Sequence, residues 1–193
     1  SLAAMQVGEV LRTRNEDFNN APYLVADPER VAMWRHLWST KGRPAIGLAW
    51  TGGVPSTGAH FRRWSLVDLL PVLRSVDAHW VCLQYRDADD ELAKFKAETG
   101  IEIHQYPHAT LTPDYDDTAG LVGSLAGVVA IDTSVVHLAG ALGVPVAAGI
   151  PQAANWRWGE KFTDQPWYRT VKLFRQGKAW PFEAIAKEAQ TWR

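Results

Sequence analysis

The chain has 193 residues and a formal net charge of -1, and 47% of its residues are hydrophobic. A chain of this length buries one sizeable core or two small ones, so we expect one α/β domain with an appendage. No apolar run approaches the roughly 20 residues of a membrane-spanning helix, and no signal peptide opens the chain, which predicts a soluble protein. The balanced charge and the lack of a Lys/Arg cluster argue against a nucleic-acid surface.

The chain contains one cysteine, Cys82, and begins with Ser1 rather than with methionine. One cysteine excludes an internal disulfide framework and fits a reducing compartment, so we expect a cytoplasmic protein. Cys82 lies inside an apolar stretch and is predicted to be an inert core residue. The missing methionine leads us to expect that the chain is a piece of a longer polypeptide.

Helical and strand patterns alternate along most of the chain. Residues 1–20 show no clean period and are expected to be a linker or the remnant of a preceding domain, whereas residues 21–193 are expected to form one domain. Strands are predicted at 45–50, 79–84, 101–106, 128–131, in the apolar run after Pro145 and at 171–174. Helices are predicted from Asp27 to near Gly42, after Ser65, from 87–91 to Gly100, from Asp116 or Asp117 through Leu125, around His137 and from about Pro181. This alternation predicts a doubly wound parallel sheet of the α/β class.

Polar residues follow a buried strand in the segment 127–149, which has the pattern of a parallel βαβ unit. Asp132, Thr133 and Ser134 therefore lie at the carboxyl edge of the sheet, where open α/β proteins bind ligands. His137 shares a helix stripe with Thr133, and the free N–H groups of the first turn favour an anion. Two interpretations remain open. These residues bind an anion, or Asp132 and Thr133 only cap the helix and His137 is a satisfied polar residue at the sheet edge.

A glycine-rich turn, Thr51, Gly52 and Gly53, follows the first predicted strand. Glycines let the backbone approach a ligand closely, with N–H groups facing a phosphate. The turn fits no Walker or dinucleotide fingerprint, so ordinary turn chemistry is the alternative. Arg62 and Arg63 precede the next predicted helix, where a guanidinium can clamp a phosphate, and the alternative for this pair is a solvated face.

Other polar residues give weaker signals. His104 and His108 are four residues apart on a strand and a loop, without a third ligand, so no metal site is predicted. Asp114, Asp116 and Asp117 do not match a calcium-binding loop and are interpreted as helix caps. The GxSxG pattern of a hydrolase nucleophile is missing.

A tryptophan-rich loop follows the last core strand and so also lies at the ligand-binding edge. Its aromatic planes could stack on a base or a sugar ring, or could pack the terminal helix against the sheet. Both interpretations stay open for Trp156 and Trp158, whereas packing is favoured for Trp167 and Trp180.

Several stretches between Ala21 and Gln176 together carry a family resemblance: APYLVADPERVAMWR, IGLAWTGG, RRWSLVDLLPVL, CLQ, DYDDTAGLVGSLAGVVAIDTSVVHLAGALGVPV, and NWRWG followed by PWYRTVKLFRQ. The most specific of them is IDTSVVHLAGALGVPV. The chain resembles the C-terminal domain of a GT-B glycosyltransferase of the bacterial type fused to tetratricopeptide repeats. That type is related to the ADP-heptose:lipopolysaccharide heptosyltransferases of glycosyltransferase family 9. The resemblance implies a Rossmann-like domain that binds a nucleotide-diphosphate sugar for inverting transfer, without a metal or another cofactor.

The resemblance also implies a set of donor-binding residues: Thr51, Gly52, Gly53, Arg63, Gln84, Asp132, Thr133, Ser134, His137 and Trp156. In this assignment Arg63 meets a phosphate, Gln84 lies near the nucleotide, and His137 lines the donor diphosphate and sugar. The sequence departs from the family at one point. VPSTGAHF follows TGG where an asparagine-containing loop is expected.

In related inverting enzymes the catalytic base and the acceptor site belong to the N-terminal domain, and this chain begins too late to contain one. We therefore expect no catalytic residue here, with His137 as a candidate contributor, and no transfer by the chain alone. The expected partners are an N-terminal GT-B domain and tetratricopeptide repeats of the parent chain. The alternatives are a degenerate GT-B-like module that serves protein interaction and a nucleotide-sugar 2-epimerase.

Overall fold

A six-stranded parallel sheet forms the centre of the computed structural model, which describes residues 14–53, 62–159 and 165–192. The strands are β1 (Ala45–Ala49), β2 (His79–Cys82), β3 (Ile103–Gln105), β4 (Gly127–Ile131), β5 (Val146–Ile150) and β6 (Val171–Arg175). Their order is β3-β2-β1-β4-β5-β6, and every neighbouring pair is parallel. The predicted doubly wound sheet is confirmed. Its order reverses between β1 and β4, which is the switch point where such sheets bind ligands.

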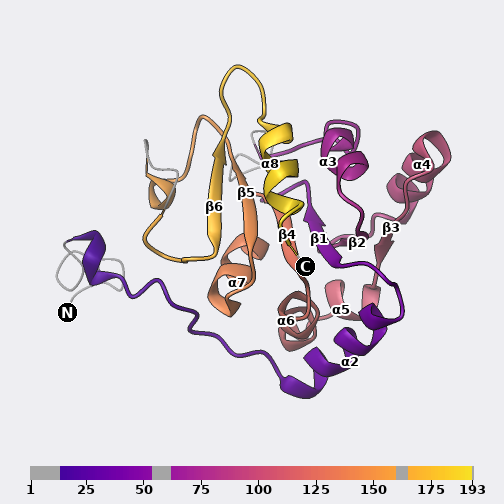
Figure 1. Ribbon diagram of the computed structural model, residues 1–193, viewed down its shortest axis with the longest axis horizontal. Coiled ribbons are helices and arrows are strands. Elements are labelled where there is room, and N and C mark those ends of the chain that lie inside the picture. Colours follow the sequence, from indigo (N-terminus) through magenta and orange to yellow (C-terminus); the bar gives the residue numbers. More distant parts are fainter. Residues whose placement is uncertain (1–13, 54–61, 160–164, 193) are drawn as a thin grey trace.

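Helices cover both faces of the sheet (Figure 1). The α-helices are α2 (Pro28–Ser39), α3 (Leu70–Ser75), α4 (Asp89–Thr99), α5 (Pro107–Thr110), α6 (Tyr115–Gly123), α7 (Ser134–Leu142) and α8 (Phe182–Ala189), and the 3-10 turns are η2 (Asn15–Asp17) and η5 (Trp156–Trp158). Helices α3, α4 and α8 lie on one face, and α2, α5, α6 and α7 lie on the other. Within the described ranges, no helix combines the length and the apolar composition needed to cross a membrane.

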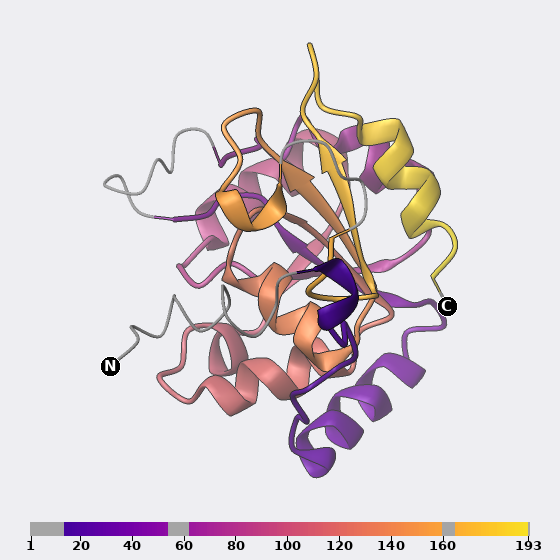
Figure 2. The same cartoon turned by 90° about the vertical axis from the view of Figure 1, so that its left-hand side faces the viewer.

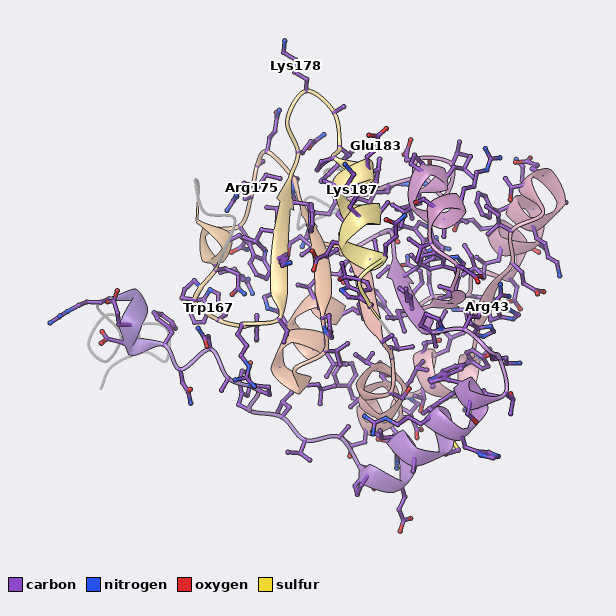
Figure 3. The ribbon with its side chains drawn as sticks, viewed as in Figure 1. Arg43, Trp167, Arg175, Lys178, Glu183 and Lys187 are labelled. Atoms are coloured by element: carbon purple, nitrogen blue, oxygen red, sulfur yellow. The ribbon has the colours of Figure 1, made fainter. Side chains whose placement is uncertain are left out.

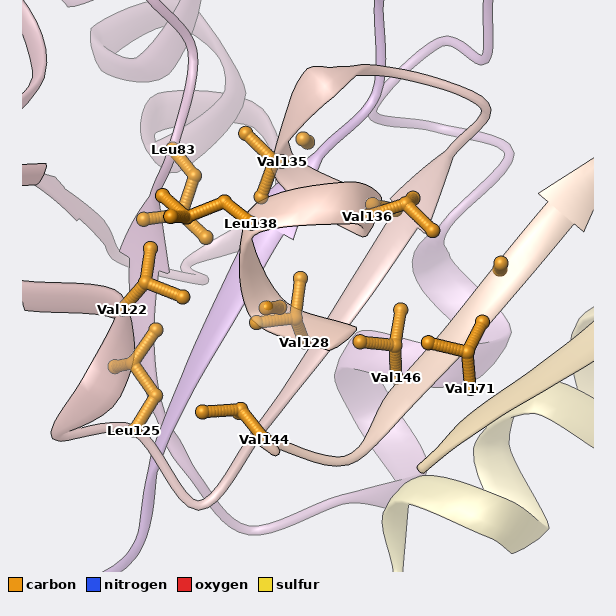
Figure 4. Close-up of a cluster of buried hydrophobic side chains, with 14 of the residues drawn as sticks. Leu83, Val122, Leu125, Val128, Val135, Val136, Leu138, Val144, Val146 and Val171 are labelled. Carbon is orange, nitrogen blue, oxygen red and sulfur yellow. The ribbon is translucent and has the colours of Figure 1, made fainter. Parts of the chain in front are cut away.

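Each face of the sheet contributes to its own hydrophobic core. Ala45 and Ala49 of β1 point into the core beneath α6 and α7, whereas Ile46 and Leu48 point into the core beneath α3 and α8. Figure 4 shows the first of these cores, where valines and leucines of α6 and α7 meet the valines of the sheet. Because every residue of the central strands is buried on one face or the other, the strands read as continuous apolar runs.

Local capping chemistry sets the start of α2 and the ends of α4 and α7. The Asp27 carboxylate accepts from the N–H groups of Glu29 (2.8 Å) and Arg30 (3.0 Å) and so caps α2. Gly100 and Gly143 end α4 and α7 in the left-handed conformation, with φ of 73° and 80°. Glycine adopts this conformation without the steric cost that other residues meet.

Two helix starts differ from the sequence interpretation. The helix expected directly after Ser65 begins at Leu70, because Ser65 and Asp68 bond each other's backbone N–H groups (2.8 and 3.1 Å) and hold a separate turn ahead of it. Asp114, rather than Asp116 or Asp117, caps α6, since its side chain accepts from the Asp116 N–H at 3.0 Å. The sequence reasoning also missed α5, a single turn that begins at Pro107.

The segment that precedes α2 runs along the edge of the sheet at which the strands begin, and it packs against α7 (Figures 1 and 2). The N–H groups of Tyr23 and Leu24 both donate to the carbonyl of Ala141, at 2.9 and 3.1 Å. Farther upstream, Phe18 meets Trp167 edge to face with ring centroids 4.7 Å apart, and Trp167 projects toward this segment in Figure 3. Residues 18–24 are therefore tied to α7 and to the loop before β6. Residues 1–13 of the predicted linker lie outside the described ranges.

Candidate functional site

A cleft of about 500 Å³ opens at the carboxyl edge of the sheet, where the segments that follow β1, β2, β4 and β5 converge. The residues that line it are Gly53, Arg62, Tyr85, Asp132, Thr133, Ser134, His137, Ala153, Ala154, Asn155 and Arg157. The cleft lies over the junction of β1 and β4, which is the switch point of the sheet. The fold therefore places this cleft where doubly wound sheets hold their ligands.

The amino terminus of α7 forms one wall of the cleft. Thr133 is 5% exposed and caps the helix, because its hydroxyl accepts from the N–H of Val135 at 3.2 Å. Ser134, the first helical residue, is exposed. The first N–H groups of a helix have no partner within it and carry the positive end of its dipole, so this wall favours an anion. The capping interpretation of Thr133 is thus correct, and it is compatible with anion binding beside the cap.

A buried carboxylate and a tryptophan fix the floor of the cleft. Asp132 is 5% exposed, and one of its oxygens accepts from the indole N–H of Trp158 at 2.8 Å. The indole of Trp158 is buried and stacks on His137 with ring centroids 5.0 Å apart and an angle of 12° between the planes. Trp158, one of the two tryptophans whose role the sequence left open, therefore packs under the cleft and holds both side chains in place.

The turn after β1 approaches α7 as closely as its backbone allows. A Cβ atom on Gly52 would overlap the methyl group of Thr133 and lie 3.0 Å from the carbonyl oxygen of Asp132. The next residue, Gly53, donates its N–H to the hydroxyl of Tyr85 at 3.1 Å. Gly52 thus permits the contact between the β1 turn and the α7 terminus, and Gly53 reaches the cleft itself.

Positive charge dominates the rim. Arg62 and Arg157 both line the cleft, and the Arg157 side chain is held by a bond from its Nε to the amide oxygen of Asn155 at 3.0 Å. Burial lowers the pKa of His137, and the nearby charge of Arg157 lowers it further, against a smaller opposing effect of Asp132. The imidazole is therefore neutral at neutral pH, and the arginines supply the cationic side chains.

The residues assigned from the sequence fall into separate places. Gly53, Asp132, Thr133, Ser134 and His137 line the cleft together. Thr51 and Gln84 are not among the residues that line it; the Gln84 amide donates to the Thr51 hydroxyl, and Gln84 is only 1% exposed. Arg63 pairs with Thr51 through a backbone bridge and is exposed, and it is the neighbouring Arg62 that lines the cleft. Trp156 belongs to η5, and its side chain lies outside the described part of the structure.

Four polar residues of the site or its support were not assigned from the sequence: Tyr85, Asn155, Arg157 and Tyr168. The rule that strand ends carry ligand contacts could have indicated Tyr85, which follows β2 closely, and the two polar residues of the loop after β5. Tyr168 bonds His137 from 31 positions away along the chain, so no local pattern announces it.

The remaining candidates lie away from the cleft. Cys82 is fully buried in β2, as predicted. His104 stacks on His79 at 4.2 Å and His108 on Trp34 at 5.3 Å, so the two histidines have separate environments. No three His, Cys, Asp or Glu side chains of the described residues are grouped so that they could hold a metal ion. Trp180 packs edge to face against a core tryptophan at 5.3 Å.

Comparison with known proteins shows the fold and one sequence relative. No protein-family model matches the chain. Protein FlbA of Caulobacter vibrioides is 34% identical over 155 residues, which are 79% of this chain and 25% of FlbA.

Two solved structures share the fold. A glycosyl transferase family 9 structure from Veillonella parvula superposes with a TM-score of 0.63 at 14% identity, over 98% of this chain and 51% of that one. The ADP-heptose LPS heptosyltransferase II of E. coli superposes with a TM-score of 0.59 at 18% identity, over 86% of this chain and 52% of that one. The chain thus spans about half of each solved structure and a quarter of FlbA.

Proposed function

We propose that this chain is the donor-binding domain of an inverting glycosyltransferase, the C-terminal half of a GT-B fold, and that its cleft binds the diphosphate of a nucleotide sugar. The observation that carries the proposal is the cleft at the β1–β4 switch point, with the α7 terminus as one wall and two arginines on its rim. The likeness of the fold to family 9 glycosyltransferases supports the reaction class.

The chemistry of the cleft suits a leaving diphosphate. Helix N–H groups and the guanidinium groups of Arg62 and Arg157 offset the negative charge that develops on it, without requiring a metal ion. Such donors are fixed before the reaction, since Asn155 holds Arg157 and Thr133 anchors the helix terminus. We propose that the acceptor site and the catalytic base belong to an N-terminal GT-B domain of a longer bacterial, cytoplasmic protein with tetratricopeptide repeats. This chain alone then binds the donor and transfers nothing.

Calorimetric titration of the chain with ADP, UDP, GDP and their sugar conjugates tests the proposal. We expect one of these families to bind, and we expect Arg157→Ala to weaken that binding about tenfold, the effect of losing one charge-assisted hydrogen bond. The matched control is Arg74→Ala, which removes an exposed arginine of α3 and should leave the affinity unchanged. Failure of every nucleotide to bind would contradict the proposal and favour the protein-interaction module. Sugar transfer by this chain alone would contradict the division of labour.

A further inference from the structure

A tyrosine outside the cleft holds one nitrogen of the cleft histidine. The hydroxyl of Tyr168 lies 3.0 Å from Nδ1 of His137 and 3.4 Å from the hydroxyl of Tyr23. We propose that Tyr168 is a positioning residue: its hydroxyl donates a hydrogen bond to Nδ1 of His137 and so leaves Nε2–H as the group that His137 offers to an anion in the cleft. The identity of that anion as a diphosphate rests on the proposed function, whereas the state of the imidazole does not.

The structure holds Tyr168 in a single place. Its backbone N–H donates to the side-chain oxygen of Gln165 at 3.0 Å, and its carbonyl accepts from the amide nitrogen of the same buried side chain. The Tyr168 ring lies directly on Gly140 of α7, where an added Cβ would sit 2.6 Å from the ring carbon Cγ. The tyrosine is thus clamped against the helix that carries His137.

The direction of the hydrogen bond follows from the acceptor strengths and the distances of the two groups that Tyr168 bonds. Burial raises the pKa of Tyr168, so its phenol keeps its proton at neutral pH. Burial lowers the pKa of His137, so its imidazole is neutral there and has one nitrogen that can only accept. An imidazole nitrogen accepts more strongly than a phenol oxygen, and it is also the nearer of the two partners. Tyr168 therefore donates to His137, and Tyr23 is left to donate to Tyr168.

Trp158 holds one face of the imidazole, because the two rings are stacked with centroids 5.0 Å apart. One contact holds the ring plane and the other holds Nδ1, so Nε2 is the ring nitrogen left to the cleft that His137 lines. Fixing the tautomer in advance removes the cost of selecting it when an anion binds. A donor arranged in this way binds anions without gaining a full positive charge.

The test combines nitrogen NMR of the His137 ring with binding of inorganic pyrophosphate. In the native chain we expect the 15N spectrum to show Nε2 protonated and Nδ1 unprotonated, and a protonated Nδ1 would overturn the inference. We expect Tyr168→Phe to move the Nδ1 resonance toward that of an acceptor without a donor and to weaken pyrophosphate binding about five- to tenfold. Because Tyr168→Phe keeps the ring and removes only the hydroxyl that bonds Nδ1, an unmoved Nδ1 resonance would also overturn it.

Two further variants keep the test decisive. Tyr106→Phe is the matched control, because it too removes a tyrosine hydroxyl that bonds a histidine. The Tyr106 hydroxyl lies 3.1 Å from Nε2 of His79, and neither residue lines the cleft. This variant should leave both pyrophosphate binding and the His137 resonances unchanged. Tyr23→Phe retains Tyr168 and should shift the Nδ1 resonance in the same direction by less, which replaces Tyr168→Phe if that variant does not fold. If the native chain does not bind pyrophosphate, the proposed function fails while the nitrogen spectrum still decides the inference.

Discussion

Replacing Gly52 with alanine tests whether the β1 turn must touch the α7 terminus. The new Cβ would overlap the Thr133 methyl group and lie 3.0 Å from the carbonyl oxygen of Asp132. Thr133 cannot rotate away freely, since its hydroxyl caps α7 through Val135, and losing such a cap costs about 1 kcal/mol. The carbonyl belongs to the backbone and yields even less.

We expect Gly52→Ala to lower the free energy of unfolding by about 2 kcal/mol, within the range for overpacking of a close contact. For a chain of this size that loss corresponds to a fall in Tm of about 4–8 °C. Nucleoside diphosphate affinity should fall as well, because the turn or the helix terminus must shift.

Gly177→Ala is the matched control for this substitution. The nearest atom to its added Cβ, the Ala179 carbonyl oxygen, lies 3.9 Å away. Its stability should therefore be unchanged or rise by up to about 1 kcal/mol through the entropy of the unfolded chain. Differential scanning calorimetry of both variants supplies the measurement. Equal melting temperatures for the two variants, together with native affinity in Gly52→Ala, would refute the reasoning.

Three further predictions concern the two cores and the cleft floor. Burial, with the positive charge of nearby groups, lowers the pKa of His79 from 6.5 to about 4, so the unfolded chain binds the extra proton first as the pH falls. This residue should therefore remove up to about 3 kcal/mol of stability between pH 7 and pH 4, and urea titrations should show a smaller loss in His79→Gln but not in the exposed His36→Gln. Trp158→Phe leaves a buried oxygen of Asp132 without its donor and should lower the free energy of unfolding by about 2–3 kcal/mol. The same substitution should cost less in Asp132→Asn, so strictly additive effects of the two substitutions in a double-mutant cycle would speak against the bond. Burial raises the pKa of the Cys82 thiol to about 12, so a disulfide reagent at pH 8 should label it only as fast as the chain unfolds, and immediate labelling of the native protein would be inconsistent with the core.

The sequence predicts the architecture well because its strands are buried on both faces. Apolar runs of this kind occur in parallel sheets, and the glycines at 100 and 143 mark helix ends by a conformation that few other residues tolerate. The grouping of Asp132, Thr133, Ser134 and His137 was accessible for the same reason. They follow one strand, and strand ends of a parallel sheet share an edge.

Two features of the site could not be predicted from the sequence. They are which of the adjacent arginines Arg62 and Arg63 lines the cleft, and which distant residue supports His137. Consecutive residues of an extended segment point to opposite sides, so the bridge between Thr51 and Arg63 decides that Arg62 lines the cleft. Without that bridge, the sequence pattern does not show which of Arg62 and Arg63 faces the cleft. Likewise, Tyr168 reaches His137 only because the loop before β6 folds back over α7, which is a property of the tertiary structure.

The central claim is that the α7 terminus binds the diphosphate of a nucleotide, and a change of charge at Ser134 tests it most directly. This exposed residue opens α7 and lines the cleft. Ser134→Asp places a carboxylate at the positive end of the helix dipole, which stabilises negative charge. The helix should therefore keep its stability or gain about 0.3–1 kcal/mol. The same carboxylate repels a bound diphosphate.

Calorimetry with the nucleoside diphosphate that binds the native chain should show at least about a tenfold loss of affinity in Ser134→Asp. The uncharged control Ser134→Asn should stay within about threefold of the native value, since it adds similar volume without charge. Equal affinities in the native chain and Ser134→Asp would contradict the claim, because an anion bound at this terminus cannot be indifferent to a negative charge there.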